Sequence, residues 1–212
     1  MNLANKLTMG RIIVIPFFIL FMFIGNIYTR VVALLIFILA ALTDIYDGIV
    51  ARHREEVTNF GKFIDPLADK LIVSAALISF VQLGELSIPA WMVILVISRE
   101  FIITGLRSVA ASRGTIIPAS LSGKFKTTSQ MVGIITILLI LIVNAVLKNY
   151  WHTTPLELQA FLGWKGMLGY ILDRVPYWLM LVVTILTVIS GFNYIFKNKQ
   201  LLFEEISSKT AS

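Results

Sequence analysis

The stretch from Asp44 to Asp69, followed by Lys70, reads DIYDGIVARHREEVTNFGKFIDPLADK and contains four aspartates. It joins two apolar segments, Val31 to Val50 and Leu71 to Leu83, so the aspartates fall at the ends of two expected membrane helices. Carboxylates are among the costliest groups to place at a membrane boundary, and those found there commonly mark functional sites. The stretch therefore predicts a pair of helices with a functional site at their shared end.

The composition is typical of a protein that crosses a membrane several times. Of the 212 residues 58% are hydrophobic and 14% are charged, and the mean hydropathy is +0.87. Apolar segments that can approach the roughly 20 residues of a spanning helix are Ile12 to Ile27, Val31 to Val50, Leu71 to Leu83, Ala90 to Ala111, Met131 to Leu147 and Val175 to Phe196. The third reaches this length if it extends back through Phe60. We expect an all-α polytopic membrane protein with six transmembrane helices.

The connections between the apolar segments are short and contain no linker or repeat, which predicts a single domain over residues 1–212. A polar segment, Asn2 to Arg11, is expected to lie at the membrane interface ahead of the first helix. Residues 148–174 are expected to form an interfacial loop or a short helix at the opposite face. The sequence contains no cysteine, which excludes disulfides, thiolate catalysis and cysteine-ligated metals.

The distribution of basic residues predicts the orientation. Thirteen of the 18 lysines and arginines fall on the side that carries both termini and the aspartates. The other side has only Arg30, Lys148, Lys165 and Arg174. By the positive-inside rule, the termini and the aspartates face the cytoplasm. The net charge of +6 is explained by this bias and by anionic lipid headgroups, so we do not expect a nucleic-acid partner.

The aspartates form two pairs at helical spacing. Asp44 and Asp47 are three residues apart, and Asp65 and Asp69 are four apart, so each pair shares a helical face. If the two helices pack side by side, four carboxylates converge and need cations to balance their charge. Oxygen ligands without cysteine favour hard ions such as Mg²⁺ or Mn²⁺. A site for two metal ions is the natural inference.

The residues around the aspartates suit a phosphate ligand. Gly48 and Gly61 leave space for backbone or a bulky ligand near the metals. Arg52 falls on roughly the same helical face as Asp44 and could neutralise phosphate oxygens. Together these features indicate a diphosphate ligand.

A second group of polar residues follows in two later segments. Arg99 and Glu100 lie within an apolar run and point about 100° apart, so each is expected to face partners on other helices. A structural ion pair and a catalytic role both remain open for them. Arg107, Lys124 and Lys126 could form an anion pocket facing the aspartates, or the lysines could simply follow the positive-inside rule.

The spacing Asp-x2-Asp-Gly-x2-Ala-Arg-x8-Gly-x3-Asp-x3-Asp resembles the signature of the CDP-alcohol phosphatidyltransferase family. The chain matches it at Asp44, Asp47, Gly48, Ala51, Arg52, Gly61, Asp65 and Asp69. Three further segments are similar to the branch of the family that makes phosphatidylglycerophosphate. They read NKLTMGR from residue 5, REFIITGLRSVAASRG from residue 99 and GKFKTTSQM from residue 123.

This resemblance implies a six-helix membrane fold, a homodimer in the bacterial plasma membrane and a site for two divalent cations. Asp44, Asp47 and Asp65 correspond to metal ligands, and Asp69 to a residue that contacts metal and acts as the general base. The residues implied to line the cytidine diphosphate are Gly48, Ala51 and Arg52, with Asn5, Thr8 and Arg11 nearby.

The reaction implied by the resemblance is transfer of the phosphatidyl group of CDP-diacylglycerol to sn-glycerol 3-phosphate, with release of CMP. Arg107, Lys124 and Lys126 are the candidates for binding the acceptor's phosphate. Other acceptors of the same family, such as inositol phosphate, serine or phosphatidylglycerol, are alternatives, although basic residues disfavour serine. A cation carrier or channel is the alternative outside the family, but its ligands would ordinarily lie near the bilayer midplane.

Overall fold

The computed structural model describes residues 3–53, 59–112 and 121–198. Within these ranges the side chains of residues 3–8, 44–53, 59–67, 69, 112, 121, 122 and 124 are not described. In the described ranges the chain is all-helical, with seven α-helices, one 3-10 helix and no strand. The elements are α1 (Leu3–Ile24), α2 (Ile27–His53), α3 (Asn59–Gln82), η1 (Gly84–Leu86), α4 (Ala90–Ser112), α5 (Leu121–Tyr150), α6 (Pro155–Leu158) and α7 (Trp164–Lys197).

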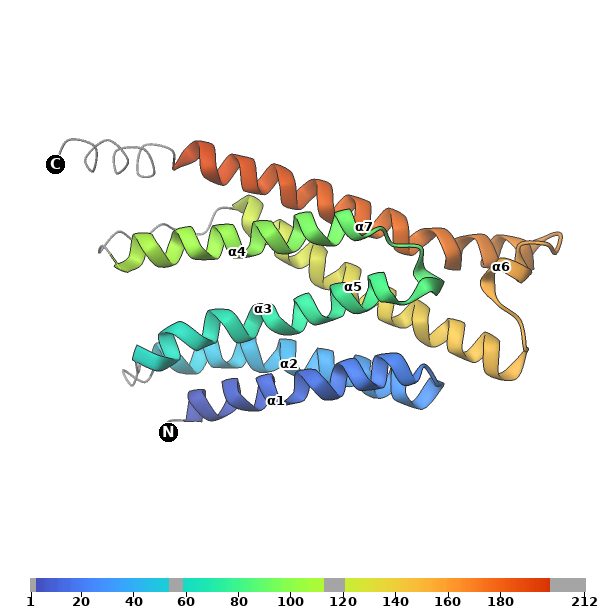
Figure 1. The fold of residues 1–212 in the computed structure, drawn as a ribbon, viewed down its shortest axis with the longest axis horizontal. Coiled ribbons are helices and arrows are strands. Elements are labelled where there is room, and N and C mark those ends of the chain that lie inside the picture. Colours follow the sequence, from blue (N-terminus) through green and yellow to red (C-terminus); the bar gives the residue numbers. More distant parts are fainter. Residues whose placement is uncertain (1–2, 54–58, 113–120, 199–212) are drawn as a thin grey trace.

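The long helices alternate in direction along the chain (Figure 1). The start of α1, the end of α2, the start of α3 and the end of α7 therefore lie at one end of the bundle, with η1 and α6 towards the other. Helix α1 packs against α2 and α3, while α7 packs against α4, α5 and α6. We call the first of these two ends the motif end, because it carries the aspartate positions.

Each of the six apolar segments falls mainly in its own long helix, but α1 differs from the prediction at both ends, since it ends at Ile24 and not at Ile27. Helix α1 already begins at Leu3, so the expected interfacial segment is the first turns of α1 and not a separate element. No proline interrupts residues 3–11, and the helix therefore continues through them. Helix α3 begins at Asn59, which confirms its extension beyond the apolar run.

The segment 148–174 contains the expected short helix, α6, but residues 148–150 belong to α5 and residues 164–174 belong to α7. Pro155 stands at the first turn of α6, and Thr154 and Glu157 form a capping box there. Helix α7 begins at Trp164, after Gly163 in a left-handed conformation with φ of 82°. A Cβ atom at Gly169 would lie 2.5 Å from the carbonyl oxygen of Pro155, so only glycine lets α6 lie against α7 here.

The surface and the lengths of the helices indicate a membrane protein. Among the described residues, the helical spans Phe125–Tyr150 and Trp164–Lys197 are long and apolar enough to cross a bilayer. Shorter apolar helical spans are Met9–Ile24, Ile27–Thr43 and Lys70–Gln82. Large apolar side chains also face outward along the bundle, as at Ile13, Leu39 and Ile94, each about 60% exposed. Such extensive apolar exposure suits contact with lipid.

The core lies between the helices and is filled mainly by large apolar side chains. Fully buried examples are Phe18 and Met22 of α1, Phe37 of α2, Phe80 of α3, Met92 of α4 and Ile137 of α5. Helix α7 contributes Met180 and Val183 to this core. Closer to its end, the buried face of α7 consists of smaller residues, including Thr187, Ser190 and Gly191. A Cβ atom at Gly191 would lie 3.0 Å from Cγ of Arg99, so this face brings α7 very close to α4.

A buried ion pair ties three elements together at the end opposite the motif. Arg30 of α2 is only 6% exposed and pairs with Glu85 of η1. Its Nη1 also donates a hydrogen bond of 2.6 Å to the carbonyl oxygen of Leu141 in α5. The guanidinium therefore links α2, η1 and α5, and its charge is compensated within the bundle.

Candidate active site

The signature aspartates lie where α2 ends and α3 begins. Asp44 and Asp47 are in the last turns of α2, and Asp65 and Asp69 are in the first turns of α3. Their helical placement at one end of the bundle agrees with the prediction (Figure 1). Their side chains lie outside the described residues, as do those of Asn5, Thr8, Gly48, Ala51, Arg52, Gly61 and Lys124. The assigned metal, nucleotide and proton-transfer roles therefore stay predictions.

The packing of α2 against α3 supports a shared site for cations. Asp44 follows Ala41 by three residues, and Asp69 precedes Val73 by four, so each aspartate position shares a helical face with that neighbour. Ala41 and Val73 line the same cavity. Helices α2 and α3 thus border one cavity, and carboxylate oxygens are a donor set that would fit Mg²⁺ or Mn²⁺. Elsewhere among the described side chains, no group of three or more histidines or acidic residues could hold a metal ion.

Arg11 is brought to the same pair of helices. Its side chain is 5% exposed and lines a small cavity together with Ala40 and Ala41 of α2 and Val73 of α3. This placement agrees with the expectation that the start of the chain lies near the motif.

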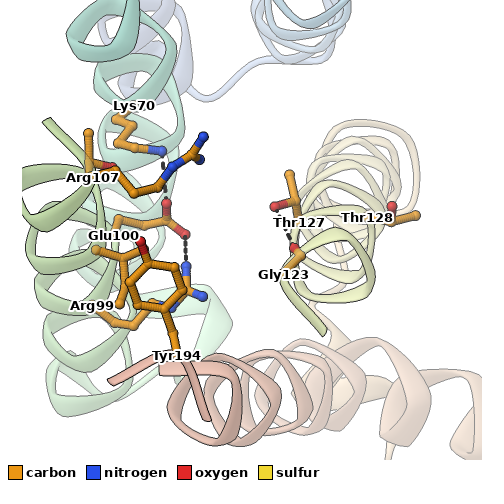
Figure 2. A pocket seen from close by; sticks show the side chains of 10 residues that line it. Lys70, Arg99, Glu100, Arg107, Gly123, Thr127, Thr128 and Tyr194 are labelled. Carbon is orange, nitrogen blue, oxygen red and sulfur yellow. Dashed lines mark hydrogen bonds and ion pairs between the residues drawn. The ribbon is translucent and has the colours of Figure 1, made fainter. Parts of the chain in front are cut away.

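A polar cavity of about 500 Å³ opens near the motif end between α3, α4, α5 and α7 (Figure 2). Its polar lining residues are Lys70, Arg99, Glu100, Thr104, Arg107, Thr127, Thr128 and Tyr194. The basic groups and Tyr194 lie on one side in Figure 2, and the two threonines of α5 lie across from them. We call this space the polar cavity.

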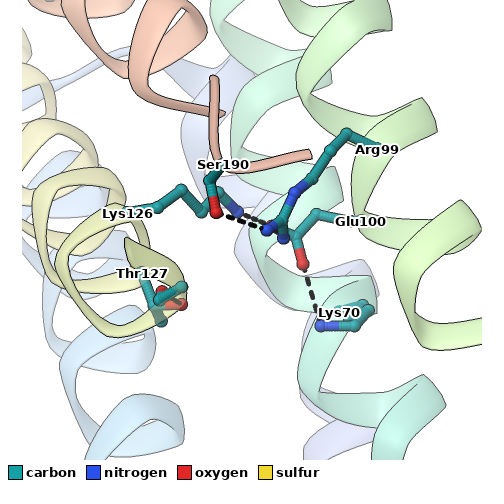
Figure 3. Close-up of polar contacts among 7 residues, drawn as sticks. Lys70, Arg99, Glu100, Lys126, Thr127 and Ser190 are labelled. Carbon is teal, nitrogen blue, oxygen red and sulfur yellow. Dashed lines mark hydrogen bonds and ion pairs between the residues drawn. The ribbon is translucent and has the colours of Figure 1, made fainter. Parts of the chain in front are cut away.

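Glu100 joins three helices through its carboxylate (Figure 3). Its Oε2 accepts a hydrogen bond of 2.9 Å from Nζ of Lys70 in α3, and it forms an ion pair with Lys126 of α5. Nη1 of Arg99 lies 3.8 Å from Oε1 of Glu100, while Nη2 of Arg99 donates a 2.8 Å hydrogen bond to Ser190 of α7. Both residues contact other helices, as predicted, but the prediction that they are poorly placed to pair with each other is wrong, because the two adjacent side chains also form an ion pair.

The three basic residues predicted for an anion pocket have different positions. Arg107 is exposed and lines the polar cavity. Lys126 is only 1% exposed and pairs with Glu100, and it is not part of the described cavity lining. Its position is therefore that of a buried counterion behind the cavity wall. The side chain of Lys124 lies outside the part of the chain that the structure describes.

Sequence reasoning missed several residues of the cavity. Lys70 directly follows Asp69, and this position was the only local signal for it. Tyr194 is far from every motif in the sequence, yet it lines the cavity, and its hydroxyl is buried without a hydrogen-bond partner in the described part of the chain. Only the packing of α7 against α4 brings this hydroxyl to the basic groups.

The lining of the polar cavity suits a phosphate group. Lys70, Arg99 and Arg107 carry positive charge, and Glu100 is the one acidic group in the described lining. Guanidinium and ammonium groups with hydroxyl donors are ordinary phosphate ligands. A phosphate bound here would lie beside the helix ends that carry the aspartates.

A helical membrane protein whose polar cavity lies beside an aspartate-rich motif has the features of a membrane-embedded phosphotransferase. The family model described as CDP-alcohol phosphatidyltransferase matches residues 1–189, and the chain belongs to this family of enzymes.

Relatives with assigned names agree with this family. A CDP-diacylglycerol--glycerol-3-phosphate 3-phosphatidyltransferase of Bacillus subtilis is 41% identical, over 95% of this chain and 97% of its own length. A protein with the same name from Rickettsia typhi is 34% identical, over 91% of this chain and 94% of its own. A probable phosphatidylglycerophosphate synthase of Mycobacterium tuberculosis is 45% identical, over 63% of this chain and 64% of its own.

Proposed function

We propose that the protein transfers the phosphatidyl group of CDP-diacylglycerol to sn-glycerol 3-phosphate, which yields phosphatidylglycerophosphate and CMP for phospholipid synthesis. The observation that carries the choice of acceptor is the polar cavity, whose lining combines Lys70 and Arg107 with threonine hydroxyls. A phosphorylated acceptor needs such a cavity, whereas serine does not. The names of the Bacillus and Rickettsia relatives support the same acceptor.

In this proposal the donor's diphosphate binds at the aspartates, and the acceptor's phosphate binds in the neighbouring polar cavity. Asp44, Asp47, Asp65 and Asp69 would hold two divalent cations, which when bound neutralise the diphosphate and the charge that develops on it. Asp69 accepts the proton of the acceptor's 1-hydroxyl, and that oxygen attacks the phosphorus that bears diacylglycerol. The bond from this phosphorus to the CMP oxygen breaks. Arg107 and Lys70 hold the acceptor's phosphate in the polar cavity, which orients its hydroxyl for attack.

We also propose the arrangement of the protein in the membrane. All six long helices span the bilayer as one domain, and both termini and the motif end face the cytoplasm. The excess of basic residues on that side supports this orientation. The working enzyme is proposed to be a homodimer in the bacterial plasma membrane.

The function is tested with purified protein, Mg²⁺ or Mn²⁺, CDP-diacylglycerol and a panel of acceptors in one assay. We expect CMP release that depends on the divalent cation and is fastest with glycerol 3-phosphate. Inositol phosphate, serine and phosphatidylglycerol are the comparison acceptors. Preference for one of these would change the assigned acceptor, and cation flux in liposomes without CMP release would support a carrier instead.

Replacing Arg107 with alanine is expected to raise the KM for glycerol 3-phosphate roughly 10- to 100-fold, because hydrogen bonds to charged groups contribute about 1.5–3 kcal/mol. The KM for CDP-diacylglycerol should change little. Steady-state kinetics with each substrate varied in turn measures both values. Arg174→Ala is the matched control, since Arg174 is 59% exposed and lies in the first part of α7, far from the motif end. An effect confined to CDP-diacylglycerol would move Arg107 to the donor site.

A further inference from the structure

A second cavity of about 650 Å³ adjoins the polar cavity and lies between α2, α3, α4 and α5. The two share Lys70, Glu100, Arg107, Thr127 and Thr128 as lining residues, so they form one continuous space. Away from these residues the walls of the second cavity are largely apolar, with Ile38, Ala41, Val73, Leu77, Met131 and Ile135 among them. We call this space the apolar cavity.

The apolar cavity continues directly from the aspartate positions into the bundle. On α2, Ala41 and Ile38 precede Asp44 at three-residue spacing. On α3, Val73 and Leu77 follow Asp69 at four-residue spacing. Residues at these spacings share one helical face. The cavity therefore begins about one helical turn farther from the motif end than the place where the donor's diphosphate is expected.

One polar group in this cavity has no hydrogen-bond partner in the part of the chain that the structure describes. Gln130 of α5 is 4% exposed and lines the apolar cavity. Its Nε2 is buried and has no hydrogen-bond partner among the described residues. A buried amide donor is rarely left unpaired, which indicates that a bound molecule or an ordered water supplies the acceptor.

The surroundings of Gln130 define the chemistry of that acceptor. Gln130 lies four residues after Lys126, about one turn farther from the motif end. A neutral group that accepts but does not donate suits the N–H groups of Nε2, because the charged side chains that line this cavity all lie in the part shared with the polar cavity. In a phosphatidyl donor, the group next to the phosphate that meets this description is the carbonyl of a fatty ester.

We propose that the apolar cavity holds the glycerol ester region of the lipid donor, and that Nε2 of Gln130 donates a hydrogen bond to an ester carbonyl. This inference rests on the proposed function, and it makes Gln130 a specificity-determining residue. It distinguishes ester-linked diacyl donors from ether-linked dialkyl donors, which have the same chains but lack the carbonyl oxygens.

The test compares CDP-dioleoylglycerol with its dialkyl ether analogue for the unaltered protein and for Gln130→Met, with glycerol 3-phosphate as acceptor. For the unaltered protein we expect kcat/KM to favour the ester donor roughly three- to ten-fold, the usual contribution of one neutral hydrogen bond. Gln130→Met should lose this preference because its kcat/KM for the ester donor falls. Its kcat/KM for the ether donor and its KM for glycerol 3-phosphate should stay unchanged. Gln82→Met is the matched control, because Gln82 is exposed at the far end of α3.

The possible outcomes separate the inference from the proposed function. If the unaltered protein uses both donors equally well, Gln130 does not recognise the ester. This result needs only the unaltered protein, so it overturns the inference even if Gln130→Met fails to fold. An unchanged preference in Gln130→Met overturns the inference too, and so does a raised KM for glycerol 3-phosphate, which would assign Gln130 to the acceptor. Equal use of both donors points to an ordered water on Gln130. If neither donor releases CMP with the unaltered protein, the proposed function itself fails.

Discussion

Replacing Asp69 with asparagine is expected to lower kcat roughly 10²- to 10⁴-fold, the usual contribution of a positioned general base. Asparagine keeps the size of the side chain and an oxygen that can contact a cation, but it cannot accept the proton of the acceptor's hydroxyl. Binding of CDP-diacylglycerol should therefore be largely retained. Asp44→Asn should behave differently and weaken divalent-cation and nucleotide binding together, because Asp44 is proposed only as a ligand.

The two variants are compared by steady-state kinetics and by calorimetric titration of CDP-diacylglycerol in the presence of Mg²⁺. Asp173→Asn is the control substitution, since Asp173 lies in the first part of α7 and pairs with its neighbour Arg174. Full turnover by Asp69→Asn would show that another group takes the proton. Loss of donor binding equal to that of Asp44→Asn would make Asp69 a metal ligand alone.

Replacing Glu100 with glutamine is expected to destabilise the protein by roughly 3–5 kcal/mol, because a buried ion pair loses one partner. Lys126 is 1% exposed, and its buried ammonium group would lose the ion pair with Glu100. Lys70 is 20% exposed and should suffer less, since water can reach it. The large effect is therefore assigned to the contact between α4 and α5.

A double variant separates charge from packing in this prediction. Glu100→Leu combined with Lys126→Met removes both buried charges and keeps similar volumes, and such replacements are often neutral or stabilising. We expect the midpoint of thermal unfolding in detergent, followed by circular dichroism, to fall clearly for Glu100→Gln and to recover in the double variant. Equal midpoints for Glu100→Gln and the unaltered protein would show that this pair contributes little to stability.

The features predicted well from the sequence are those set by neighbouring residues in the chain. Apolar segments locate the long helices because burial in lipid is a property of each segment. The helical positions of the four aspartates follow from spacing alone. The sequence predicts too late a start for α1, because polar residues such as Asn5 and Thr8 suggest a separate interfacial segment although both are compatible with a helix.

The partners of polar groups depend on packing between helices, and the sequence does not encode them locally. The adjacent positions of Arg99 and Glu100 indicated correctly that their partners lie on other helices, but not that these are Ser190 and Lys126. Lys126 looked like Arg107 in the sequence, yet one is buried beside a carboxylate and the other lines a cavity. Gln130 gave no signal at all, because its unpaired amide becomes visible only once its neighbours are known.

The close approach of α7 to α4 at Gly191 links a residue outside the motif to the wall of the polar cavity. The stem of Arg99 runs over this glycine, 3.0 Å from where a Cβ atom would stand, and Arg99 forms part of the wall of the polar cavity. One added methyl group at position 191 would stand so close to this stem that the side chain of Arg99 would have to shift. The shape of the polar cavity therefore depends on a glycine of α7, a helix that carries none of the signature residues.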